Sequence, residues 1–113
     1  MIDVNRTIKY IKESGYNPYS DNKLSKSDIF YINTLEDHYS MLANEIQSVL
    51  KDNTINSILE LGSYMAVGSH LARDAGVKNI TCSDMYDLDT NSSYRNWLST
   101  KNINYQHFDL TRE

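Results

Sequence analysis

Several features are scarce in this sequence, and each scarcity excludes a class of protein. Cys82 is the only cysteine among 113 residues, so the chain forms no internal disulfide. No apolar run approaches the roughly 20 residues that a membrane-spanning helix needs. Asp3, Asn5 and Arg6 interrupt the start of the chain, which is therefore no signal peptide. We expect a cytoplasmic protein with no contact to a membrane.

Metal-ligand clusters and basic clusters are missing as well. The three histidines, His38, His70 and His107, lie too far apart to build a zinc site with a single cysteine. Residues 1–53 carry 6 basic and 8 acidic side chains, and residues 54–113 carry 5 and 7, so the net charge of −4 is evenly spread. Because phosphate binding needs clustered Lys and Arg, no nucleic-acid partner is indicated.

The first half of the chain has helical spacing of its apolar residues. Residues 2–14 predict a short amphipathic helix, and the polar run at residues 15–25 predicts a loop. A longer helix is predicted over residues 35–50, with Thr34 and Asp37 as a capping box.

An earlier start of this longer helix, at Ser27, would extend the same apolar stripe through Ile29 and Ile32. We assign residues 1–53 to an N-terminal helical segment.

The second half alternates between two patterns. Residues 55–61, 79–84 and 103–110 predict three short strands, and residues 67–75 and 92–98 predict helices between them. This order implies an α/β fold with a Rossmann-like parallel three-stranded sheet, because parallel neighbours need a crossover. Right-handed crossovers place both helices on one face, so we expect the preceding long helix to cover the other face.

Each predicted strand ends beside a carboxylate. Glu60, Asp84 and Asp109 lie at the three carboxyl ends, where open parallel sheets bind ligands. Gly62 would let the backbone turn sharply next to such a ligand. Asp84 follows Gly62 by 22 residues, about the spacing at which an acid reaches the hydroxyl groups of a ribose. The pattern favours a nucleotide site, and the alternative is a structural turn with solvated acids.

The residues after Gly62 disfavour a dinucleotide such as NAD. Tyr64 and Val67 stand where the G-x-G-x-x-G turn requires its second and third glycines. Glu60 would also repel a phosphate, whereas its carboxylate would stabilise a cation such as an ammonium or sulfonium group.

These residues resemble the class I S-adenosylmethionine-dependent methyltransferases. "ELGSYMA" at residues 60–66 is similar to the first motif of that family, with Tyr64 and Ala66 in place of two glycines. "ITCSDMYD" is similar to its second strand and "HFDLT" to its third. The resemblance implies S-adenosyl-L-methionine as the cofactor and residues 54–113 as the cofactor-binding half of a Rossmann-like domain. It implies that the cofactor-binding residues are Glu60, Gly62, Ser63, Tyr64, Asp84, Met85 and Asp109.

In that family the sheet continues beyond a third strand, and the later part binds the methyl acceptor. No segment of this sequence corresponds to it, so we expect the isolated chain to transfer no methyl group, and we assign no catalytic residue. The first strand of that family is central and has a neighbour on each side. Strand 55–61 would here have a neighbour on one side only, so its other edge would be open. We expect a homodimer, or a tendency to aggregate, through this edge; the alternative is that the helix at 35–50 or the N-terminal helix wraps the edge and keeps a monomer.

Two further interpretations stay open. The protein could be a non-catalytic interaction module that recruits a partner through the exposed sheet edge. The loop tyrosines Tyr16, Tyr19 and Tyr31 could close over a cofactor or simply pack at the rim of the core.

Overall fold

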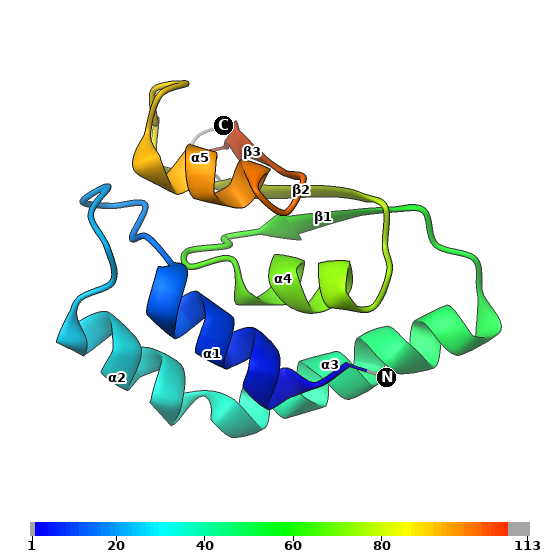
Figure 1. Ribbon diagram of the computed structural model, residues 1–113. Helices are drawn as coiled ribbons and strands as arrows, with labels where there is room; N and C mark the ends of the chain where they lie inside the picture. The colour runs from blue at the N-terminus through cyan, green and yellow to red at the C-terminus, as the bar shows by residue number, and fades with distance from the viewer. Residues whose placement is uncertain (1, 109–113) are drawn as a thin grey trace.

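The computed structural model describes residues 2–108, and Figure 1 shows their arrangement. Three helices precede the first strand, and strands and helices then alternate. The elements are α1 (Val4–Ser14), α2 (Lys26–Thr34), α3 (Glu36–Asp52), β1 (Ser57–Leu61), α4 (Val67–Asp74), β2 (Asn79–Asp84), α5 (Ser93–Ser99) and β3 (Ile103–His107).

The three strands form an open, wholly parallel sheet in the order β1-β2-β3. This confirms the α/β fold and the strand–helix–strand–helix–strand order that the sequence predicts. The register places Ile58, Ile80 and Ile103 side by side on one face of the sheet. Both crossover helices pack on this face: α4 contacts β1 and β2, and α5 contacts β3.

The helix predicted over residues 35–50 is confirmed as α3, but its alternative start at Ser27 and its predicted capping box are wrong, because residues 26–34 form the separate helix α2. Ser25 and Asp28 form the capping box, at the start of α2. Leu35 separates α2 from α3 and gives no side-chain cap, while the Thr34 hydroxyl donates to the Tyr31 carbonyl. The apolar stripe continues through the break, so hydrophobic periodicity alone left both starting points open.

The expectation that the long helix covers the second face of the sheet is also wrong. In Figure 1, α3 and α1 lie on the far side of α4 from the strands, and both pack against α4. All of these helices are therefore on the same side of the sheet. On the other face, Leu59 is 58% exposed and Leu61 is 54% exposed. Among residues 2–108, no helix covers this second face.

One hydrophobic core joins the N-terminal helices to the sheet half. Ile8 and Ile11 of α1 pack in the same buried cluster as Leu71 of α4 and Ile80 of β2. The N-terminal helices and the sheet half thus contribute to one core, and the N-terminal segment is placed to reach the carboxyl ends of the strands.

Candidate functional site

The connection between β1 and α4 has an unusual backbone. Gly62, Tyr64 and Ala66 have φ angles of 68°, 45° and 59°, all in the left-handed region. Glycine adopts this region freely, whereas other residues do so at a cost of about 1–2 kcal/mol. Two of the three left-handed residues in this turn are not glycines, so contacts from elsewhere in the molecule must hold the turn in place.

Tyr64 is held by several groups at once. Its main-chain N–H donates to Oδ2 of Asp84 at 2.7 Å, and its carbonyl accepts from the Tyr94 hydroxyl at 2.6 Å. Its own hydroxyl accepts from Nδ2 of Asn17 at 3.2 Å. These contacts come from β2, α5 and the N-terminal loop, so three separate parts of the chain fix one strained residue.

Asp84 ends β2 and ties that strand to the turn. Besides the Tyr64 amide at Oδ2, its Oδ1 accepts from the Met85 N–H at 2.8 Å. The main-chain N–H of Ser63 also donates to the carbonyl of Ser83, at 2.9 Å. A carboxylate has about four lone-pair sites. Two of them on Asp84 are occupied here, which leaves capacity for a ligand on this half-exposed side chain.

Glu60 lies beneath the start of α4. Its Oε1 accepts from the N–H of Ser69 at 3.1 Å and from the Ser69 hydroxyl at 2.7 Å. A Cβ at Gly68 would overlap the other carboxylate oxygen, so Gly68 allows this close approach. Burial raises the pKa of Glu60, the bonds from Ser69 act against that rise, and the charge of Asp84 adds to it.

A pocket of about 190 Å³ opens between these groups and the N-terminal helices. Glu60 is its single acidic lining residue, and neither Lys nor Arg lines it. The lining residues come from α2, α3, β1, α4 and the linkers between these elements: Tyr31, Leu35, His38, Tyr39, Leu42, Glu60, Gly62, Ser63, Tyr64, Met65, Val67 and Gly68.

Three tyrosines also line this pocket: Tyr31, Tyr39 and Tyr64. Tyr39 is buried, and burial, with the neighbouring Tyr31 and Glu60, raises its pKa to about 12. The Tyr31 ring meets the Tyr64 ring edge to face, with centroids 6.4 Å apart. Since the negative faces of aromatic rings attract cations, this lining suits a positively charged group better than an anion.

The N-terminal loop also reaches the turn. Asn17 is buried and donates to Asp28 as well as to Tyr64, while the Tyr19 ring packs edge-on against Tyr86. Of the loop tyrosines considered from the sequence, Tyr19 and Tyr31 therefore contact rings beside the turn.

The predicted site residues are only partly brought together. Glu60, Gly62, Ser63 and Tyr64 line the pocket, and Asp84 bonds to the turn from β2. Met85 is 54% exposed next to Asp84. Asp109 lies outside the described residues.

Sequence reasoning missed four residues that complete the site. They form hydrogen bonds to the groups above or line the pocket, and they come from the N-terminal loop, α3 and α4: Asn17, Tyr39, Gly68 and Ser69. Gly68 alone had a readable signal: a glycine inside a predicted helix often marks a close approach.

Among residues 2–108, no three His, Cys, Asp or Glu side chains gather as a metal site. Over the same part of the chain, no helix is both long and apolar enough to cross a bilayer.

Comparison of this chain with protein-family models, curated proteins and solved structures found no match.

Proposed function

We propose that the β1–α4 turn binds S-adenosylmethionine and that this chain is the cofactor-binding portion of a methyltransferase. The observation that carries the proposal is the left-handed backbone at Gly62, Tyr64 and Ala66. These are the positions at which the family motif has its glycines. Strained backbone that several contacts hold in place occurs mainly at functional sites. Binding of a ligand would therefore explain why the turn keeps this shape without the glycines.

The polar groups around the turn support the same ligand. Asp84 has unoccupied lone pairs at the end of β2, and two ribose hydroxyls could donate to them. The pocket offers Glu60 and three tyrosine rings to a cation, and neither Lys nor Arg lines it to bind a phosphate. A ligand with a ribose and a sulfonium or ammonium group matches both parts, whereas a pyrophosphate matches neither.

In this proposal the chain binds and orients the cofactor, and the cofactor carries the reactive methyl group. Glu60 would stabilise the positive charge, and Asp84 would fix the ribose and hold the turn. A bound cation would favour the charged form of Glu60 and so act against burial, which raises the pKa of this carboxyl.

Calorimetry with S-adenosylmethionine and S-adenosylhomocysteine tests the proposal. The two ligands share the ribose and differ in the sulfonium charge. Asp84→Asn keeps an acceptor for the Tyr64 amide but removes the charge, so it should weaken both ligands by about 1–2 kcal/mol. Glu60→Gln should weaken S-adenosylmethionine more than S-adenosylhomocysteine. Absence of binding at millimolar ligand to the folded protein would refute the proposal.

The alternative, a non-catalytic interaction module, is favoured by a different observation. The outer edge of β1 has no strand beside it among the described residues. If this protein binds neither S-adenosylmethionine nor S-adenosylhomocysteine but does bind a partner at the β1 edge, the interaction-module function is supported.

A further inference from the structure

The outer edge of β1 and the groove above it form a surface that the proposed cofactor site does not use. The carbonyl of Asn56 accepts from the N–H of Asn79 at the start of β2. Because the main-chain groups of successive strand residues point to opposite edges, Ile58 and Glu60 also face β2. The N–H and C=O groups of Ser57, Leu59 and Leu61 then point away from the sheet. Within residues 2–108, no strand pairs with them.

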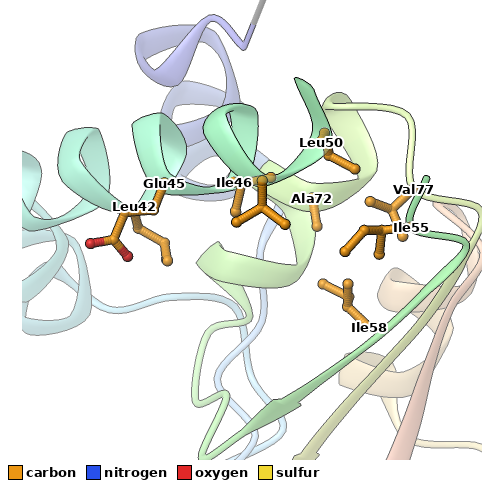
Figure 2. A pocket seen from close by; sticks show the side chains of 9 residues that line it. Leu42, Glu45, Ile46, Leu50, Ile55, Ile58, Ala72 and Val77 are labelled. Atoms are coloured by element: carbon orange, nitrogen blue, oxygen red, sulfur yellow. The ribbon is translucent and has the colours of Figure 1, made fainter. Parts of the chain in front are cut away.

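An apolar groove of about 250 Å³ runs directly beside this edge. Figure 2 shows its two walls: Leu42, Ile46 and Leu50 project from α3 toward Ile55 and Ile58 at β1. The rest of the groove is lined by Glu45, Val49, Ala72 and Val77. Glu45 is the single charged residue of this lining.

We propose that this surface binds an extended segment of a partner polypeptide, which adds a strand to β1. The unpaired groups of Ser57, Leu59 and Leu61 require an extended backbone opposite them, as in other cases of strand addition. Alternate apolar side chains of that segment enter the groove under α3. A Lys or Arg at its border pairs with Glu45.

The size of the groove agrees with a segment that inserts alternate side chains. A cavity of about 150 Å³ holds one benzene ring, so a groove of about 250 Å³ takes two or so apolar side chains. The unpaired main-chain groups beside the groove favour a strand over a helix, because a helix already satisfies its own backbone groups.

The position of α3 favours a separate strand over a second copy of this chain. In an antiparallel β1–β1 pair, both copies would carry their helices on the same face of the joined sheet. Neighbouring strands are only about 4.8 Å apart, whereas packed helices need 8–10 Å. Since α3 and β1 together line the groove at this edge, the α3 helices of the two copies would meet there. A free strand has no helix to place there.

The test uses a short synthetic peptide in which Ile and Val alternate with Lys, added to isotopically labelled protein. At a peptide concentration ten times the dissociation constant, the amide protons of Ser57, Leu59 and Leu61 should exchange about tenfold more slowly. The amides of Ile58 and Glu60 already face β2 and should change little. A peptide of the same composition with its apolar residues grouped together is the control.

Two variants separate the strand edge from the groove. Leu59→Pro removes an outward N–H at an edge position that tolerates proline, and it should weaken the peptide at least tenfold; Leu59→Thr keeps that N–H and should not. Val49→Asp places a charge at the exposed rim of the groove and should also cost at least tenfold.

Two results would overturn the proposal. One is unchanged exchange of the three edge amides at millimolar peptide. The other is a protein that is dimeric by light scattering, with the same amides protected without peptide and no competition by it. This second result would instead support the homodimer expected from the sequence.

Discussion

His70 lies in the core of the molecule and makes folding depend on pH. It is only 2% exposed, between α1 and α5, and its ring stacks on Trp97 with centroids 4.6 Å apart. Its Nδ1 is 2.7 Å from the Ala66 carbonyl, which can only accept, so Nδ1 carries the proton and donates. Nε2 is buried and has no hydrogen-bond partner among the described residues. A proton on Nε2 would therefore be poorly solvated.

The magnitude follows from the shift in acidity. Burial lowers the pKa of His70 from 6.5 to about 4, although the Ala66 carbonyl and Asp74 act in the opposite direction. The unfolded chain binds a proton as the pH falls through 6.5, and the folded chain does so only near pH 4. The free energy of unfolding should therefore fall by about 2 kcal/mol between pH 7.5 and pH 5, and by about 3 kcal/mol at pH 4.

Urea unfolding followed by circular dichroism at pH 7.5 and pH 5 measures this loss. His70→Phe keeps a ring against Trp97 and cannot titrate, so its loss over the same interval should be smaller by about 2 kcal/mol. Each protein is compared with itself at two pH values, so a packing change in the variant cancels.

Burial raises the pKa of Glu60, so the folded state binds a proton there more readily than the unfolded state, and acidification stabilises the fold at this residue. This contribution is the same in the parent protein and in His70→Phe. His38→Gln, at an exposed histidine of α3, is the matched control and should behave like the parent protein. If His70→Phe loses as much stability on acidification as the parent protein, the reasoning about the buried imidazole is wrong.

Two other predictions concern glycines. Gly62→Val and Gly76→Val both place a side chain in open space at a positive φ, so each should lower the free energy of unfolding by at least about 1–2 kcal/mol. Only Gly62→Val should abolish binding of S-adenosylmethionine, measured by calorimetry. Gly68→Ala should lower stability by about 1–3 kcal/mol in urea unfolding, because its Cβ would overlap the Glu60 carboxylate. In a Glu60→Ala background the same substitution should cost clearly less, and strictly additive costs would contradict the contact.

Local signals in the sequence were sufficient to predict most of the fold. Alternating apolar runs and helical spacing predicted α1, α4, α5 and the three parallel strands, and Gly15 follows α1 as expected. The placement of α3 was missed, because it depends on which surfaces pack together. Spacing shows that a helix has an apolar face, but not that α4 rather than the sheet covers it.

The candidate site was also only partly predictable, because part of it depends on contacts between elements that are distant in the sequence. The carboxylates at the ends of β1 and β2 could be placed by counting along the strands. Their partners could not be, because Asn17 and Tyr39 reach the turn from elements far away in sequence. Nor could the sequence indicate that Glu60 would bond to Ser69 in the next helix.

Tyr64 illustrates how a turn can hold a left-handed residue that is not a glycine. A glycine reaches positive φ without help, so a glycine-rich turn can be recognised from local sequence alone. Tyr64 instead needs the carboxylate of Asp84, the hydroxyl of Tyr94 and the amide of Asn17 to stay in this conformation. Because Asn17 belongs to the N-terminal loop, the shape of the turn depends on a segment that a motif search would treat as separate. The helices before β1 are thus part of the site's architecture, and a ligand that orders the turn would also order the loop that contacts it.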